Sequence, residues 1–255
     1  MSSPLKAWLE RDGALLRLRL ARPKANLIDA EMIGVLRVAL STYASNRGLL
    51  AALIDHEGPH FSFGASVEEH LPGQCERMLA SLHALIGAML DWPRPILMSI
   101  RGQCLGGGLE FALAGGLIFA APDARLGQPE MKLGVFAPAA SVLLPLRVGQ
   151  ARAEDLLYSG RSIDAATAHA WGLVNEVADD PSAAALAYFA SNLADKSGAS
   201  LAYAVRAARE ALADVARARL DDVEALYLEK LMSTRDANEG LQAFIEKRQP
   251  KWEHR

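Results

Sequence analysis

Alternating and periodic apolar positions divide the chain into strands and helices up to about residue 141. Leu16, Leu18 and Leu20 alternate with two arginines, which predicts a half-exposed strand. Asp29 can cap a helix that runs to about residue 46. Further strands are predicted over residues 49–55, 95–101 and 117–121, and a helix over 73–91. Strands that alternate with helices predict βαβ units and a mostly parallel sheet.

The pattern changes after about residue 141, where strand signals become few and alanine-rich helical runs dominate. Helices are predicted over residues 182–194, 201–216 and 221–231. We therefore divide the chain into a core domain, residues 1–181, and a C-terminal helical region, residues 182–255. No low-complexity linker separates the two, so the helical region is not expected to be an independent domain.

Two glutamates stand in specialised settings. Residues 106–108 are a glycine triplet between a predicted strand and a predicted helix, and Glu110 follows in the first turn of that helix. The first N–H groups of a helix lack internal partners, so an N–H near Gly107 can donate to a developing oxyanion. Glu110 is flanked by apolar residues and is predicted to be buried, while Glu130 follows a proline in a turn. Two carboxylates that converge on one water suit general acid/base catalysis.

Composition narrows the class of protein. A hydrophobic content of 51%, a charged content of 22% and a net charge of −3 describe a globular protein with no expected nucleic-acid or membrane partner. The two cysteines do not suggest a disulfide framework, and the N-terminus lacks the basic-then-apolar order of a signal peptide. Glu110 and several glycines interrupt the most apolar stretch, 105–121, so no membrane-spanning helix is predicted. We expect a cytoplasmic protein without a metal site.

The glycine triplet, the turn that carries Glu130 and the upstream run 61–65 together resemble the enoyl-CoA hydratase/isomerase (crotonase) superfamily. The resemblance extends from residue 22 to residue 248. It implies an α/β, crotonase-type fold of repeated ββα units with a helical C-terminal oligomerisation region. It also implies that the backbone N–H groups of Ala65 and Gly107 hold a thioester oxygen. Members that hydrate a double bond carry two glutamates, here Glu110 and Glu130.

The resemblance has further consequences for ligands and partners. The substrate is expected to be an acyl-CoA thioester, and because coenzyme A is part of that substrate, no separate cofactor is expected. The protein is expected to form a homo-oligomer, either a trimer or a dimer of trimers, in which a lysine of the C-terminal helix reaches the coenzyme A of its own or a neighbouring subunit. The residues expected to bind substrate are Lys24, Ala25, Phe63, Val67, Phe136 and Lys247.

The segment after Glu130 suggests the acyl group. Residues 136–141 replace a glycine-rich run found in many family members. This segment, with Phe63 and residues 67–70, resembles the branch of the family that hydrates cyclohexa-1,5-diene-1-carbonyl-CoA in anaerobic aromatic breakdown. We therefore predict a hydratase of a conjugated cyclic dienoyl-CoA. The sequence does not indicate which of the two glutamates donates the proton.

Three alternative functions remain. The first is a hydratase of linear enoyl-CoA chains, against which the segment 136–141 argues. The second is an enoyl-CoA isomerase, against which the presence of a second glutamate argues. The third is a non-catalytic acyl-CoA-binding protein, against which the retention of both glutamates argues. A hydration assay would distinguish the third from the others.

Overall fold

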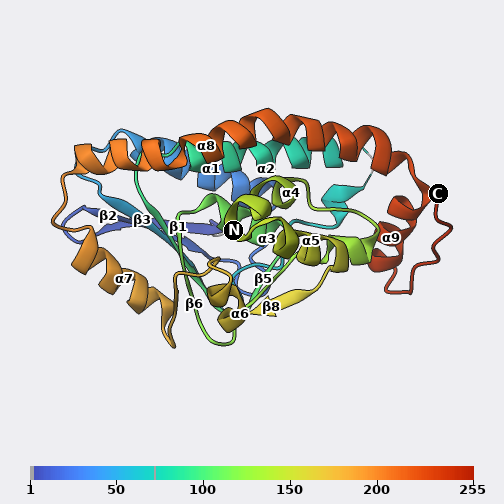
Figure 1. The fold of residues 1–255 in the computed structure, drawn as a ribbon, viewed down its shortest axis with the longest axis horizontal. Coiled ribbons are helices and arrows are strands. Elements are labelled where there is room, and N and C mark those ends of the chain that lie inside the picture. Colours follow the sequence, from blue (N-terminus) through green and yellow to red (C-terminus); the bar gives the residue numbers. More distant parts are fainter. Residues whose placement is uncertain (1–2, 72) are drawn as a thin grey trace.

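The computed structural model describes residues 3–71 and 73–255, and two sheets organise it (Figure 1). In the larger sheet the strand order is β1-β2-β3-β4-β6-β9, with β1 antiparallel to β2 and the other neighbours parallel. In the smaller sheet the order is β5-β7-β8. The strands are β1 Leu5–Glu10, β2 Leu15–Leu20, β3 Ala51–His56, β4 Ile96–Ile100, β5 Gln103–Leu105, β6 Leu117–Ala120, β7 Arg125–Gly127, β8 Ser162–Asp164 and β9 Glu176–Val177.

The chain repeats a unit of two strands followed by a helix. After β4 it leaves the larger sheet, forms β5 in the smaller one and enters a helix, and it does the same through β6 and β7. Ser62, which follows β3, makes a parallel bridge to Cys104 in β5, so the preceding unit also touches the smaller sheet. The predicted ββα repeat is therefore confirmed, and each unit delivers a turn to the smaller sheet.

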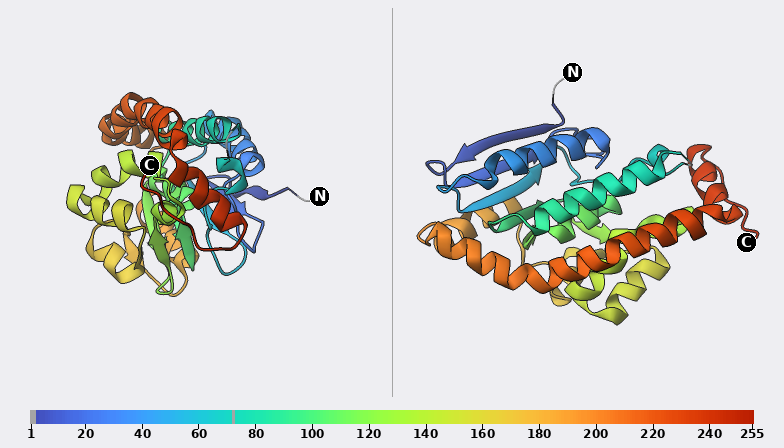
Figure 2. Two further views of the ribbon diagram at one scale, coloured as in Figure 1. Left: turned by 90° about the vertical axis from the view of Figure 1, so that its right-hand side faces the viewer. Right: turned by 90° about the horizontal axis from the view of Figure 1, so that it is seen from above.

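Helices cover both faces of the larger sheet. On one face α1 and α2 pack together, and α8 lies alongside α2 and across α4 (Figures 1 and 2). On the other face α7 packs against β3, β4 and β6. The α-helices are α1 Ala30–Ala44, α2 Cys75–Leu90, α3 Gly107–Ala114, α4 Pro138–Val148, α5 Gln150–Ser159, α6 Ala165–Ala170, α7 Pro181–Asn192, α8 Gly198–Ala225 and α9 Arg235–Ile245. Shorter turns are 3-10 helices η1 Glu68–His70, η2 Pro129–Leu133 and η4 Leu231–Ser233, and the π-helical turn η3 Leu226–Lys230.

The alternation of side chains along β2 and β3 separates two apolar clusters. Leu16 and Leu18 face the main core with α1, α2 and α3, whereas Leu15 and Leu53 face α7. Successive side chains of a strand point to opposite faces, so this division follows from the period of two. The same alternation places Asp55 on the face that α7 covers, away from the helices of the main core.

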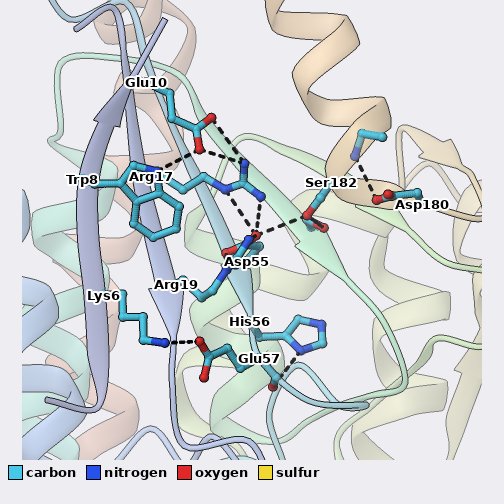
Figure 3. A network of polar contacts seen from close by, with 12 residues as sticks. Lys6, Trp8, Glu10, Arg17, Arg19, Asp55, His56, Glu57, Asp180 and Ser182 are labelled. Atoms are coloured by element: carbon cyan, nitrogen blue, oxygen red, sulfur yellow. Dashed lines mark hydrogen bonds and ion pairs between the residues drawn. The ribbon is translucent and has the colours of Figure 1, made fainter. Parts of the chain in front are cut away.

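An ion-pair network surrounds Asp55 on that face (Figure 3). Asp55 is 3% exposed and accepts hydrogen bonds from the side chains of Arg17 and Arg19 and, at 3.3 Å, from the hydroxyl of Ser182 on α7. Arg17 also lies 3.4 Å from a carboxylate oxygen of Glu10. The expectation of a half-exposed strand is therefore wrong for Arg17, which is 5% exposed because its charge is paired inside the protein.

One other expectation needs correction. The helices predicted over 201–216 and 221–231 are one helix, α8, that continues into η3, because residues 217–220 contain no glycine or proline to interrupt it. No strand was predicted at β1, at β9 or at the three strands of the smaller sheet. The predicted cap is confirmed, since the Asp29 side chain accepts the N–H of Met32. None of the helices within 3–71 and 73–255 combines the length and apolar content needed to cross a bilayer.

Candidate active site

A glycine turn between β5 and α3 brings one end of the smaller sheet against Glu130. Gly106 has φ +52°, a conformation that side chains other than glycine rarely adopt, and its N–H donates to the Gly127 carbonyl at 3.0 Å. A Cβ added at Gly106 would lie 2.6 Å from Glu130 Oε1. Glycine at this position therefore provides both the turn and the space for the carboxylate.

Two backbone N–H groups meet beside this turn. A Cβ on Gly64 (φ +105°) would lie 3.3 Å from the Gly107 nitrogen, and a Cβ on Gly107 would lie 3.1 Å from the Ala65 nitrogen. Within the described parts of the chain, neither the Ala65 N–H nor the Gly107 N–H donates to a protein acceptor. Gly107 is also the first residue of α3, whose N-terminus carries partial positive charge. This pair can therefore bind an oxygen atom that gains negative charge.

Glu110 is a buried carboxylate held by the start of another helix. It is 3% exposed, and its Oε1 accepts the backbone N–H of Ala140 at 2.8 Å, in the first turn of α4. Burial raises its pKa to about 7, and the N–H groups of Ala140 and Ala139 partly oppose that rise because they stabilise the ionised form.

Glu130 lies in η2 and has a weaker set of partners. The Gln128 amide, oriented with its nitrogen toward Glu130, places that nitrogen 3.2 and 3.1 Å from the two carboxylate oxygens. Burial raises the pKa of Glu130 to about 8, and the negative charge of Glu110 adds to the rise. The two carboxyls therefore titrate as a pair, and near neutral pH they hold about one proton between them. A pair in this state offers one base and one acid at the same place.

Both glutamates line a narrow cavity of about 60 Å³. Ala65 and Gly107 line it as well, and so do three of the residues expected to bind substrate, Phe63, Val67 and Phe136. Hollows of about 530 and 460 Å³ lie along α2 and α8, but neither glutamate lines them. The structure thus brings seven of the ten expected site residues to one cavity. His70, Ala137 and Pro138, from the segments 67–70 and 136–141 that suggested the acyl group, also line the cavity. Further lining residues that were not predicted are Met78, Leu79, Leu82, Leu133 and Val135.

The other three expected residues lie outside this cavity. The carbonyl of Ala25 accepts the N–H of Phe63 at 3.0 Å, so its turn is attached to the cavity wall. Lys24 is exposed in the same turn. Lys247 is exposed just beyond α9 with φ +55°, and it does not line the cavity of its own chain. Whether these residues contact coenzyme A stays a prediction.

The site residues that were not predicted differ in whether the local sequence contains a signal for them. Gln128 lies in the same turn as Glu130, so its place beside that carboxylate could have been found from the local sequence. Met78, Leu79 and Leu82 belong to an amphipathic helix, and an apolar residue on such a helix is usually a core residue. Only the tertiary packing of α2 against the glycine turn identifies them as cavity wall.

The family profile described as enoyl-CoA hydratase/isomerase matches residues 10–255. The chain belongs to the enoyl-CoA hydratase/isomerase family. It is 63% identical to a cyclohexa-1,5-dienecarbonyl-CoA hydratase of Thauera aromatica, covering 100% of this chain and 98% of that protein. It is 34% identical to a probable enoyl-CoA hydratase of Bacillus subtilis, covering 92% and 93% of the two chains. The crystal structure of an enoyl-CoA hydratase/isomerase from Pseudoalteromonas atlantica matches with a TM-score of 0.86 at 28% identity, covering 98% and 99%. These similarities confirm the predicted family and the crotonase-type fold.

Proposed function

We propose that this member of the family adds water to cyclohexa-1,5-diene-1-carbonyl-CoA. The observation that carries the proposal is the pair of buried glutamates in one apolar cavity beside two free backbone N–H groups. Its similarity along the full chain to the Thauera aromatica hydratase supports the ring as substrate. The same similarity confirms the prediction that the chain is an acyl-CoA hydratase.

The reaction begins with the thioester oxygen bound by the N–H groups of Ala65 and Gly107. Glu110, whose ionised form is stabilised by the start of α4, takes a proton from water. The water oxygen bonds to the ring carbon next to the one that carries the thioester, and the π electron pair moves into the thioester as a dienolate. Glu130, which holds the shared proton, donates it to the far end of the diene. The product is an allylic alcohol, and because no electrons leave the substrate, the step needs no redox cofactor.

The apolar wall of the cavity favours a ring over a flexible chain. Phe136, Ala137 and Pro138 form this wall where the chain enters α4. A flat ring loses fewer internal rotations on binding than a linear acyl chain does. Misfits on the scale of one methylene change transition-state binding by about 1–3 kcal/mol, so the preference should be substantial without being absolute.

A comparison of two substrates tests this proposal. We expect kcat/KM for the cyclic dienoyl-CoA to exceed that for crotonyl-CoA by roughly tenfold or more. Phe136→Gly should narrow the gap because it loosens the wall, while Phe136→Leu, which keeps an apolar side chain, should preserve most of it. Equal or reversed preference in the wild type would leave the hydratase of linear chains as the better assignment.

We propose that the C-terminal helical region contributes to an oligomer, whose threefold axis is what the resemblance to the crotonase family implies. The region leaves large apolar side chains on the surface, including Tyr203, Leu226 and Phe244, which are 74%, 52% and 55% exposed. Apolar groups in such numbers suit a contact with other copies of the chain. In that assembly Lys247 reaches the coenzyme A of its own or a neighbouring subunit. Light scattering should show a trimer or a dimer of trimers at micromolar concentration, and a stable monomer would contradict the proposal.

A further inference from the structure

Tyr227 is a buried tyrosine whose hydroxyl has no protein partner among the described residues. The side chain is 0% exposed, and its oxygen is fully covered. Buried polar groups are almost always hydrogen-bonded, because leaving one unpaired costs roughly 1–3 kcal/mol. A ligand that binds beside the hydroxyl is one explanation of such an exception.

The surroundings of Tyr227 connect it to the acyl cavity. Its ring contacts Phe136 edge to face, with centroids 5.4 Å apart and planes at 66°. It packs in one cluster with Met78, Leu79 and Val135, which line the cavity as Phe136 does. Burial raises the pKa of the Tyr227 phenol, and the nearby Cys75, Glu130 and Glu110 add to that rise. The contacts of its ring therefore place Tyr227 against the wall of the cavity that holds the two glutamates.

A local change in helix geometry presents this side chain. Tyr227 lies in η3, the π-helical turn that continues α8, where the N–H of Leu231 reaches back to the carbonyls of Leu226 and Tyr227. Single π-helical turns are uncommon and occur frequently at functional sites. Here the turn directs a tyrosine from the end of α8 toward Phe136, away from exposed neighbours such as Leu226.

The size of the cavity indicates which wall must move. An apolar cavity of about 150 Å³ holds benzene, whereas this one measures about 60 Å³. A six-membered ring therefore requires the cavity to widen. Phe136 is a partly buried side chain of the wall, and its ring packs against Tyr227, which does not itself line the cavity. The phenol hydroxyl can therefore reach a ligand in the cavity only if the Phe136 ring moves.

We propose that Tyr227 is a further specificity-determining residue, whose hydroxyl donates a hydrogen bond to the water that is added and to the ring hydroxyl that this water becomes. The proposal rests on the proposed function. The ring of the substrate is a hydrocarbon, so before water adds it offers no acceptor to Tyr227. The oxygen delivered between Glu110 and Glu130 is the one polar atom that the reaction introduces there. A hydroxyl bound this way favours the alcohol and the transition state leading to it over the unreacted diene.

Tyr227→Phe tests the proposal, because it removes one oxygen and keeps the ring against Phe136. Two saturated, unreactive probes separate the hydroxyl from the ring: cyclohexane-1-carbonyl-CoA, and its 2-hydroxy derivative with the hydroxyl next to the thioester-bearing carbon. We expect Kd of the hydroxylated probe to rise by roughly threefold to tenfold, as the loss of one neutral hydrogen bond implies. We expect Kd of the plain ring to stay unchanged and kcat for hydration to fall by a similar factor. Tyr188→Phe, which removes a phenol oxygen on the α7 face of the sheet, should change none of these values.

The melting temperature separates a binding role from a structural one. If the hydroxyl is unpaired in the free protein, Tyr227→Phe should keep or raise Tm. A lower Tm together with unchanged Kd and kcat would assign the hydroxyl to folding and overturn the proposal, and so would equal losses for both probes. If the wild type itself fails to hydrate the cyclic diene, the proposed function fails instead. The two failures are therefore distinguishable.

Discussion

Two clusters of buried charged side chains lie on opposite sides of the larger sheet, and they differ in the signs of the charges that they bring together. On the α7 side, Asp55 is surrounded by Arg17, Arg19 and the hydroxyl of Ser182. On the side of the main core, Glu110 and Glu130 share a cavity with each other, and within the described residues no arginine or lysine pairs with either. The first group unites unlike charges, and the second brings like charges together.

The difference separates structural charge from functional charge. A carboxylate that accepts hydrogen bonds from several donors fixes the elements that carry them relative to one another, here β2, β3 and α7. Two carboxylates buried together have raised pKa values, a pattern that is frequent at functional sites. Burial alone does not distinguish the groups, since Asp55 and Glu110 are each 3% exposed. Their partners distinguish them.

The largest expected effect comes from neutralising the like-charged pair. Glu110→Gln and Glu130→Gln should each lower kcat for hydration by about 10²–10⁴-fold, because each removes a group that transfers a proton. The change is nearly isosteric, so binding of the acyl-CoA should remain. Steady-state kinetics and direct binding measurements on both variants check this. A variant with kcat near that of the wild type would remove that glutamate from the mechanism.

Much of this site could be predicted from the sequence because its parts are local. The glycine triplet and Glu110 fall within five residues, 106–110, and Glu130 stands in its own short turn. Ala65 and Phe63 lie in one run after β3. In such segments the conformation follows from residue type, as the positive φ of Gly64 and Gly106 shows.

The remaining parts depend on contacts between distant segments. Tyr227 meets Phe136 only because α8 lies alongside α2 and across α4, and no local sequence pattern near residue 227 indicates this contact. Arg17 and Asp55 pair across two parallel strands, so the alternation of β2 could only be interpreted as half-exposed. The start of α4 stabilises Glu110 from 30 positions away in sequence. Local propensity carries no information about such partners.

A substitution in the cluster of Asp55, Arg17 and Arg19 should lower the free energy of unfolding without changing catalysis. Asp55→Asn leaves Arg17 buried with Glu10 as its remaining acidic partner, and breaking a buried ion pair costs about 3–5 kcal/mol. Urea unfolding at pH 7 should show this loss, while kcat per folded molecule stays unchanged. Glu57→Gln is the control, since it removes an exposed pair with Lys6 and should cost less than about 1 kcal/mol. A large loss of kcat in Asp55→Asn with unchanged stability would contradict the division drawn between the two groups.

The smallest effect is a dependence of stability on pH that the like-charged pair imposes. The folded pKa values of Glu110 and Glu130, about 7 and about 8, lie above the ordinary glutamate value of 4.5. Between pH 4.5 and 8 the folded state therefore binds more protons than the unfolded state. The contribution of this pair to the stability of the folded state is therefore fully present below pH 4.5, the ordinary pKa of glutamate. It is lost as the pH rises through the folded pKa values of the two residues.

Glu130→Gln should remove the larger share of this dependence, because folding raises the pKa of Glu130 further than that of Glu110. We expect the variant to gain stability relative to the wild type between pH 5 and pH 9, by on the order of 1–3 kcal/mol, since one pKa unit corresponds to about 1.4 kcal/mol. Other titrating groups are common to both proteins and cancel in the difference. Urea unfolding of both proteins at pH 5, 7 and 9 measures it. A difference that stays constant with pH would mean that folding does not raise the pKa of Glu130, and the contrast with the charge-paired Asp55 would then be lost.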